Sequence, residues 1–101
     1  MADAIPCKGC QKNLGDHTRQ RGFISIFAQG DERILSWWLC DACGVYTRRE
    51  YVDRFHGEPD VYLYGPFPKD VGDADLARVA TCPASDDKWC TCETHRHFES
   101  H

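Results

Sequence analysis

The sequence contains no apolar run long enough to cross a bilayer, no internal repeat and no low-complexity tract. A membrane-spanning helix needs roughly 20 consecutive apolar residues, so we expect no membrane-embedded segment. There is also no glycine-rich phosphate loop and no defensible Ser-His-Asp spacing, and neither Cys-x-x-Cys turn is followed by the histidine typical of haem attachment. These absences argue against a membrane protein, a repeat protein, a P-loop enzyme, a serine hydrolase and a c-type cytochrome.

The chain also has fewer positively than negatively charged residues, with 12 lysines and arginines against 16 aspartates and glutamates. The formal net charge is −4, and it falls to about −7 if four thiolates bind one zinc ion and three thiolates with one histidine bind another. Such a total would repel a nucleic acid. Residues 1–56 carry eight lysines and arginines against seven acidic residues, whereas residues 57–101 carry four against nine. Any surface for a polyanion is therefore expected in the first half.

Seven cysteines stand out in a chain of only 101 residues. A chain of this length buries a modest fraction of its surface, and small domains commonly need disulfides or a metal ion to fold. An odd number of cysteines leaves at least one thiol outside any complete set of intramolecular disulfides, and the first residues show no apolar run typical of a signal peptide. We expect a reducing, cytoplasmic location with the cysteines bound to metal.

Four of the cysteines form two turns of the type Cys-x-x-Cys. Cys7 and Cys10 make the first turn, and Cys40 and Cys43 make the second. Two residues between cysteines place both sulfur atoms on one side of a tight loop, and two such loops facing each other present four thiolates at the corners of a tetrahedron. The spacing predicts a closed, structural metal site, and loss of any one ligand is expected to unfold this part of the chain.

This pattern resembles the zinc ribbon over residues 7–46, a family in which two cysteine knuckles grip one zinc ion and the domain holds nucleic acid or another protein. The segment from Trp38 to Val45 is also similar to the second knuckle of rubredoxins, and the 29 residues between Cys10 and Cys40 match their usual interval. Rubredoxins hold iron and carry electrons. This chain has Gln11-Lys12 where they have glycine and an aromatic residue, and Asp41 where they have proline. We therefore expect zinc rather than iron.

A second metal site is predicted in the C-terminal tail, with three cysteines and one histidine as ligands. Alternate residues of an extended segment point the same way, and a Cys-x-x-His spacing repeats that of a knuckle. The predicted ligands are Cys82, Cys90, Cys92 and His95, with His97 as the alternative fourth ligand. The tail has few apolar residues, so we expect metal rather than hydrophobic burial to order it.

Other interpretations of the tail remain open at this point. Cys82 could form a disulfide with Cys90 or Cys92, or the tail could be disordered and bind metal adventitiously through its histidines. An incomplete site could also be catalytic or pass metal on. No spacing in the chain identifies a general base near the metal, so we expect no enzymatic activity.

The remaining sequence predicts strands followed by helices. Gly22 to Ala28 and Arg33 to Leu39 are typical of a hairpin with two apolar faces, closed by the turn from Gln29 to Glu32. The capping-box pattern from Thr47 to Glu50 predicts a helix over residues 48–56 that covers one face.

After Pro59 the chain predicts a third strand and a second helix. The strand is expected from Val61 to Tyr64, and a helix of about two turns is expected to begin at a cap on Asp73 and to stop before Pro83.

These observations predict a small metal-stabilised α+β fold. Its core would be a zinc-ribbon-like or rubredoxin-like antiparallel β-hairpin, with one or two short helices and a metal-ordered tail. Residues 1–68 would form the zinc-ribbon-like domain, and residues 69–101 a short helix and the Cys/His tail packed on it.

The preferred function is a non-enzymatic interaction module that holds two structural zinc ions and docks an unidentified protein through exposed aromatics and the arginines between Arg48 and Arg54. The first alternative is a nucleic-acid-binding ribbon with Tyr46 or Trp37 for base stacking. Its cations would be Arg19, Arg21, Arg33, Arg48 and Arg49. The second alternative is a rubredoxin-like iron and redox protein or a metal carrier.

Overall fold

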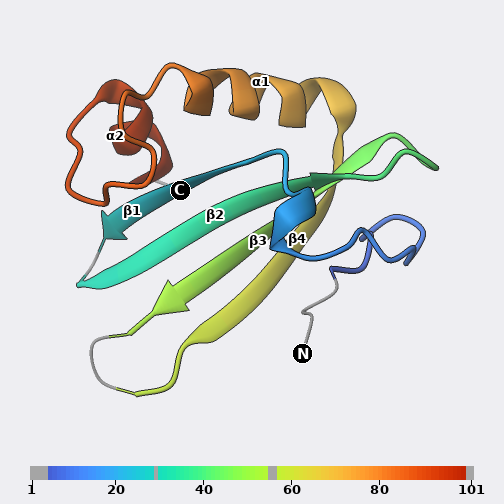
Figure 1. Cartoon of the computed structure of the whole chain (residues 1–101), viewed down its shortest axis with the longest axis horizontal. Coiled ribbons are helices and arrows are strands. Elements are labelled where there is room, and N and C mark those ends of the chain that lie inside the picture. The colour runs from blue at the N-terminus through green and yellow to red at the C-terminus, as the bar shows by residue number, and fades with distance from the viewer. Residues whose placement is uncertain (1–4, 29, 55–56, 100–101) are drawn as a thin grey trace.

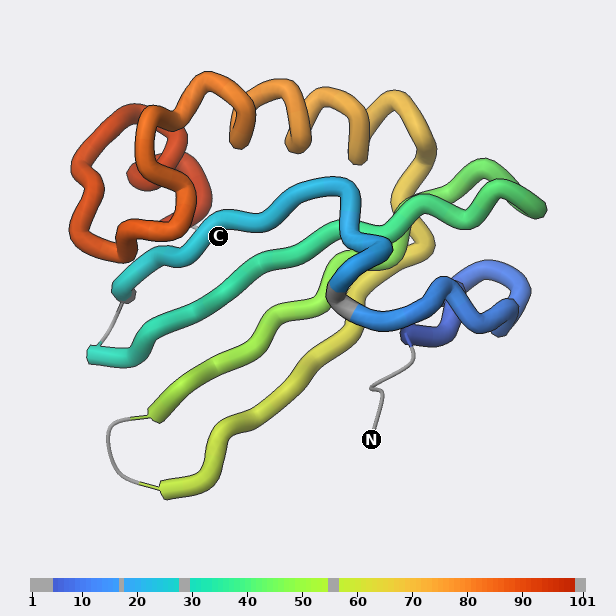
Figure 2. The backbone as a smooth tube through the Cα atoms, in the orientation of Figure 1, coloured from blue at the N-terminus to red at the C-terminus, as the bar shows by residue number. Residues whose placement is uncertain are grey.

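The computed structural model describes residues 5–28, 30–54 and 57–99. Four strands form one antiparallel sheet in the order β1-β2-β3-β4, so that each strand pairs with the next one along the chain. Two α-helices and a short 3-10 helix complete the α+β fold of the described residues, and Figures 1 and 2 show their arrangement. The elements are η1 (His17–Arg19), β1 (Gly22–Ala28), β2 (Asp31–Leu39), β3 (Val45–Asp53), β4 (Asp60–Pro68), α1 (Lys69–Ala80) and α2 (Glu93–Glu99).

The hairpin predicted at the start of the sheet is confirmed. Strands β1 and β2 pair with Ile24 opposite Leu35 and with Gly22 opposite Trp37. Residues directly opposite each other share a face of the sheet, which gathers Ile24, Ile26, Leu35 and Trp37 on one face. All four side chains are buried.

The helix predicted over residues 48–56 is wrong, because the chain continues as strand β3. Phe55 and His56 lie outside the described residues. The capping-box pattern is present, but β2 ends in a tight turn and offers an unpaired edge to the segment that follows. Pairing along this edge involves the eight residues from Tyr46 to Asp53 and satisfies their backbone groups that face β2. It also buries Tyr46 and Thr47 on opposite faces of the sheet, which a helix could not do.

Strand β4 and helix α1 are both longer than predicted. The predicted strand over residues 61–64 extends over Asp60–Pro68 and is the fourth strand rather than the third. Helix α1 begins at Lys69, directly after Pro68, so Asp73 is an internal residue and not the cap. The carboxylate of Asp73 instead accepts hydrogen bonds from Tyr46 and Lys69.

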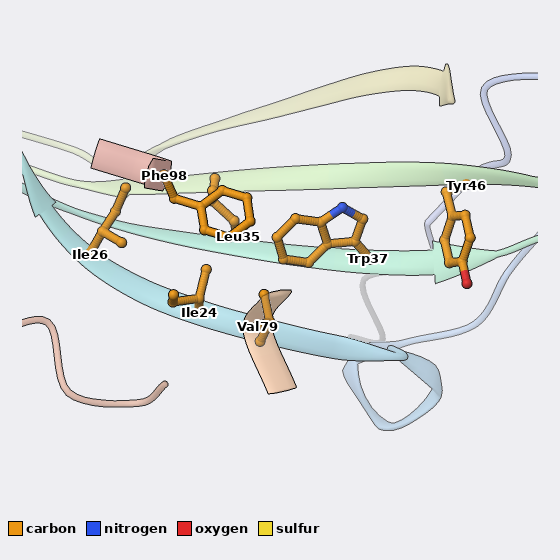
Figure 3. Close-up of a cluster of buried hydrophobic side chains, with 7 residues drawn as sticks. All are labelled: Ile24, Ile26, Leu35, Trp37, Tyr46, Val79 and Phe98. Atoms are coloured by element: carbon orange, nitrogen blue, oxygen red, sulfur yellow. The ribbon is translucent and has the colours of Figure 1, made fainter. Parts of the chain in front are cut away.

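The core lies between one face of the sheet and the two helices. Figure 3 shows its side chains, with Trp37 in the middle of the group and Phe98 beside it. The ring centroids of Trp37 and Phe98 are 5.5 Å apart. The members of the core are Ile24, Ile26, Leu35, Trp37, Tyr46, Val79 and Phe98. Phe98 belongs to the tail and is only 2% exposed, so hydrophobic burial does contribute to ordering the tail, contrary to the prediction.

A single glycine allows α1 to approach the sheet closely. A Cβ atom on Gly72 would lie 2.0 Å from the Cδ2 atom of Tyr46, which is far inside van der Waals contact. The backbone of the helix therefore rests directly on the buried ring of Tyr46. This contact places the tyrosine hydroxyl within reach of Asp73, one residue further along the helix.

The N-terminal segment covers the opposite face at one end of the sheet. The indole N–H of Trp38 donates to the carbonyl oxygen of Asp16 at 3.0 Å, and the backbone N–H of Lys8 donates to Thr47 Oγ1 at 2.9 Å. Trp38 and Thr47 are buried as a result. Figures 1 and 2 show this segment beside the β2–β3 turn, whereas the tail lies near the other end of β1.

Neither α-helix of the described residues has the length and apolar composition needed to span a bilayer.

Candidate metal centres

The two Cys-x-x-Cys turns have the same backbone geometry. In the first turn, Cys7 donates its N–H to the carbonyl of Lys12 at 2.8 Å and accepts from the N–H of Gln11 at 2.8 Å. In the second, Cys40 donates to Val45 at 2.9 Å and accepts from Gly44 at 2.7 Å. The hydrogen bonds thus connect equivalent positions in the two turns, which makes both of them knuckles of one type.

The residue after each knuckle adopts a left-handed backbone conformation. Gly44 has a φ of 67° and so does Gln11. Glycine adopts this conformation without steric cost, whereas other residues do so at a cost. Gln11 therefore occupies the position that glycine occupies in the second knuckle. Because the two residues differ, the sequence does not show that the two knuckles share a backbone conformation.

The knuckles bring four sulfur atoms together as cluster 1, which consists of Cys7, Cys10, Cys40 and Cys43. The Sγ separations are 3.4 Å for Cys7 to Cys43, 3.7 Å for Cys10 to Cys40 and 3.8 Å for Cys10 to Cys43. A tetrahedron with metal–sulfur bonds of about 2.3 Å has edges of about 3.8 Å. The sulfur atoms therefore lie at the separations that one tetrahedral ion requires.

Hydrogen bonds change the pKa values of the thiols in cluster 1. Burial raises the pKa of the Cys7 thiol, but backbone N–H groups of Cys10 and Gly9 and the neighbouring thiols outweigh burial and lower this pKa to about 6. The pKa of Cys40 is also lowered, chiefly by the backbone N–H of Cys43. Hydrogen bonds to Cys7 and Cys40 raise the pKa of Cys43 to about 12. A metal ion would displace the protons that the cluster retains.

Cluster 2 contains Cys82, Cys90, Cys92 and His95. The Sγ atom of Cys82 lies 3.9 Å from that of Cys90 and 3.5 Å from that of Cys92. The Nδ1 atom of His95 lies 3.3 Å from the Sγ atoms of both Cys82 and Cys92. A tetrahedral zinc ion with sulfur and nitrogen ligands has S···N edges of about 3.6 Å. These four residues therefore also fit a single ion.

Three structural elements position cluster 2. Cys82 follows the end of α1, and Cys90 and Cys92 lie in the loop before α2, which carries His95. The hydroxyl of Thr94 donates to the carbonyl of Arg78 at 3.0 Å, which ties the start of α2 to the end of α1. His97 is outside the cluster and packs against Phe98, with ring centroids 4.9 Å apart.

The second nitrogen of His95 contacts the sheet. Nε2 lies 2.9 Å from the carbonyl oxygen of Ser25 in β1, and the imidazole is fully buried. A carbonyl only accepts hydrogen bonds, so Nε2 carries the proton and Nδ1 presents a lone pair to the sulfur atoms. A hydrogen bond of this kind fixes the tautomer of many metal-binding histidines. No sequence pattern indicates this contact, because Ser25 lies 70 residues away.

The thiols of cluster 2 also differ in acidity. Burial raises the pKa of the Cys92 thiol, but the backbone N–H of His95 and the neighbouring thiols of Cys82 and Cys90 outweigh burial and lower this pKa to about 6. Burial raises the pKa of Cys82 to about 11. All seven cysteines are free, so the disulfide considered for the tail is not formed.

The arginines predicted to contact a partner also make contacts within the fold. The guanidinium of Arg48 lies 5.1 Å from the ring centroid of Tyr64, and that of Arg49 lies 5.2 Å from the ring of Trp38. Arg54 forms ion pairs with Asp60 and Asp31. These side chains stabilise the β3–β4 side of the sheet.

The aromatic residues proposed for base stacking are not accessible. Trp37 is 0% exposed and Tyr46 is 3% exposed, so neither can stack on a base. Arg33 forms an ion pair with Glu50 on the neighbouring strand. Of the five arginines considered for nucleic-acid binding, Arg19 and Arg21 are the two that border a hollow near cluster 1.

This basic hollow was not predicted as a site. Its volume is about 390 Å³. The ion pair at its border, from Arg21 to Asp41, has a separation of 3.9 Å, which is too long for a hydrogen bond. The residues around it are Lys12, Asn13, Leu14, Gly15, Arg19, Arg21, Leu39 and Asp41. Three cations from the first half of the sequence thus gather at one end of the molecule.

Comparisons with protein-family models, with curated proteins and with solved structures found no match to this chain.

Proposed function

We propose that this is a non-enzymatic zinc-binding protein in which both clusters hold structural zinc ions. The observation that carries the proposal is the geometry of the two clusters, whose ligand atoms lie within 4.8 Å of one another in each. Four cysteines, or three cysteines with one histidine, are ligand sets typical of structural zinc. Each set supplies all four ligands from the protein, which leaves no open position for a substrate or an activated water.

Zinc fits the donor chemistry better than iron. The rubredoxin resemblance covers only residues 7–46 and fails at Gln11, Lys12 and Asp41. A histidine ligand in the second cluster also departs from the all-sulfur sites in which rubredoxins hold iron. Zinc has no redox chemistry, so the ions would stabilise the fold rather than transfer electrons.

Metal analysis of the purified protein tests this proposal. We expect two zinc ions per chain, a colourless solution and a cobalt-substituted form with the absorption bands of tetrahedral sulfur coordination. An iron absorption spectrum in the protein as isolated would support the rubredoxin-like alternative instead. Loss of one ion in a Cys43→Ser variant and of the other in a Cys92→Ser variant would assign each ion to its cluster.

We also propose that the metal-stabilised fold docks an acidic protein partner at the basic hollow. The support is the local excess of cations at Lys12, Arg19 and Arg21, in a chain whose net charge is −4. The other arginines of the first half already have partners within the sheet. A partner that is recognised by charge gains mainly in association rate and specificity.

A glutamate-rich peptide is a suitable probe for this surface. Binding to the wild-type protein should weaken at higher salt and should be lost in an Arg19→Glu/Arg21→Glu variant. Arg78→Glu, an exposed position on α1, is the matched control and should bind as the wild type does. Equal binding by the two variants would contradict the proposed surface. Tighter binding of single-stranded DNA than of the peptide would favour the nucleic-acid alternative.

A further inference from the structure

Strand β1 is an edge of the sheet with a composition that favours pairing with another chain. It lies at one end of the strand order. Its seven residues, GFISIFA, include no charge and no proline. Edge strands usually carry charged residues or proline that prevent pairing with another chain, and short uncharged segments of high β-propensity are the ones most prone to pair. Another part of the chain must therefore protect the edge of β1 from pairing with a second molecule.

The tail provides this protection at the middle of the strand. Ser25 is the fourth of the seven residues of β1, and both of its backbone groups face the tail. Its N–H donates to the carbonyl of Ser85 at 2.7 Å, and its carbonyl accepts from His95 Nε2 at 2.9 Å. The first contact comes from the loop between Cys82 and Cys90, and the second from a cluster 2 ligand. Figure 1 shows the tail beside β1.

Side-chain contacts add to these hydrogen bonds. The ring centroid of Trp89 lies 4.6 Å from that of Phe27 in β1. The loop that carries Ser85 and Trp89 contains no helix or strand, and Trp89 is 63% exposed. Such a loop has little burial to hold it in place. The four ligands of cluster 2 are the feature that would close it into a fixed shape.

We propose that cluster 2 is a metal-dependent latch on β1: with a metal bound it holds the tail over Ser25, and without one it frees the edge of β1 to pair with β1 of a second copy of this chain. The proposal rests on the proposed function, because it requires a metal ion in cluster 2. Antiparallel self-pairing centred on Ser25 brings no like charges together, since β1 carries none.

The opposite edge of the sheet is a poorer pairing surface. Strand β4 contains Pro66 and Pro68, which have no N–H to donate to a new strand, and it begins at the charged Asp60. Prolines and charges are the protective features that β1 lacks. The tail therefore covers β1, which is the edge strand whose sequence lacks charges and prolines.

The first test removes one sulfur ligand without touching β1. Cys90→Ser is suitable, because the contacts of Cys90 are with Cys82 and Asp87 rather than with the strand. We expect this variant to lose one of two metal ions in native mass spectrometry and to sediment toward twice the monomer mass as its concentration rises. At concentrations low enough for the variant to stay monomeric, the Ser25 amide should exchange with solvent at least about 100-fold faster than in the wild type, whereas pairing of two β1 edges in the dimer would protect it again. A variant that loses one ion but stays monomeric with a protected Ser25 overturns the latch.

A second pair of variants identifies the edge that pairs. In the Cys90→Ser background, Phe27→Lys places a charge on β1 and should restore the monomer. Tyr62→Lys places the same charge on β4, where the side chain is already 42% exposed, and should leave the dimer intact. Restoration of the monomer by Tyr62→Lys alone would assign the pairing to β4 and overturn the proposal.

A third variant separates the effect of the bound metal from that of the histidine contact. His95→Cys keeps four ligands but removes the donor to the Ser25 carbonyl, whereas the Ser25 N–H still donates to Ser85 in the metal-closed loop. We therefore expect two bound ions, a monomer and slow exchange at Ser25. Amides of β2 and β3 serve as a reference for folding. If the reference amides of Cys90→Ser lose protection, His95→Cys provides the decisive comparison: fast exchange at its Ser25 while both ions are bound overturns the latch. A wild-type protein without metal in cluster 2 would instead refute the proposed function.

Discussion

The two nitrogens of His95 face different parts of the molecule. Nδ1 points at the sulfur atoms of Cys82 and Cys92, and Nε2 donates to Ser25 in the sheet. One side chain thus joins a candidate metal site to the edge of the fold. Sequence spacing predicted His95 as a ligand because it lies three residues after Cys92, whereas the partner of its other nitrogen depends on tertiary packing and could not be predicted.

Gly72 is the residue where local preference and packing conflict most strongly. An alanine at this position would favour the helix by about 1 kcal/mol, but its Cβ would lie 2.0 Å from Tyr46. We expect Gly72→Ala to lower the free energy of unfolding by at least about 2 kcal/mol, measured by urea denaturation with metal present. Ala77→Gly, at an exposed position of the same helix, is the control and should cost about 1 kcal/mol. A more stable Gly72→Ala variant would contradict the close contact.

Tyr46 gives the stability a dependence on alkaline pH. Burial and the hydrogen bond to Asp73 raise the pKa of Tyr46 to about 12, from an ordinary value of 10.0. The unfolded chain therefore loses this proton at lower pH than the folded chain, so the contribution is complete below pH 10 and is lost as the pH rises toward 12. The difference in unfolding free energy between the wild type and Tyr46→Phe should shrink over this range. A constant difference would contradict the raised pKa.

At the scale of elements, the hairpin was predictable and the next strand was not. Strands β1 and β2 show in the sequence because period-two apolar patterns act locally. The segment from Thr47 to Glu50 carries a helix-start pattern, but the edge of β2 next to it determines its conformation. The sequence predicts too late a start for α1 because Asp73 resembles a cap, although Asp73 is a hydrogen-bond partner of Tyr46. Long-range contacts override both local signals.

Helix α2 should depend strongly on a single side chain. Phe98 is 2% exposed and packs against Trp37, so Phe98→Ala should lower the free energy of unfolding by about 3–5 kcal/mol. Trp89→Ala removes a larger ring that is 63% exposed and should cost less than about 1 kcal/mol. Thermal and urea denaturation of both variants provide the comparison. Equal losses would mean that the tail is not held by the core contact of Phe98.

At the scale of the whole molecule, the two clusters lie toward opposite ends of the sheet. Cluster 1 joins the N-terminal segment to the β2–β3 turn, and cluster 2 joins the tail to β1. Sequence spacing alone predicts the ligand residues of both clusters, and the structure brings each set together. Spacing succeeds here because Cys-x-x-Cys and Cys-x-x-His turns determine their own local shape, whereas the basic hollow near cluster 1 required the fold.

Removal of metal should have a different effect at each cluster. Cluster 1 contains the fully buried Cys7 and Cys40, and binding of a structural zinc ion is worth on the order of 10 kcal/mol. We expect Cys7→Ser to abolish cooperative unfolding of the sheet, because this energy is comparable to the stability of a small domain. Cys92→Ser should leave a folded sheet with an unprotected tail. Circular dichroism and hydrogen exchange of the two variants distinguish these outcomes.

The central claim is that divalent ions hold this small fold together. Native mass spectrometry of the intact protein, combined with circular dichroism before and after chelation, tests it most directly. The account predicts a mass increase that corresponds to two zinc ions per chain, and loss of the β-sheet signal once both ions are removed. A protein that carries no metal in its native state and keeps the same spectrum in the presence of a chelator would contradict it.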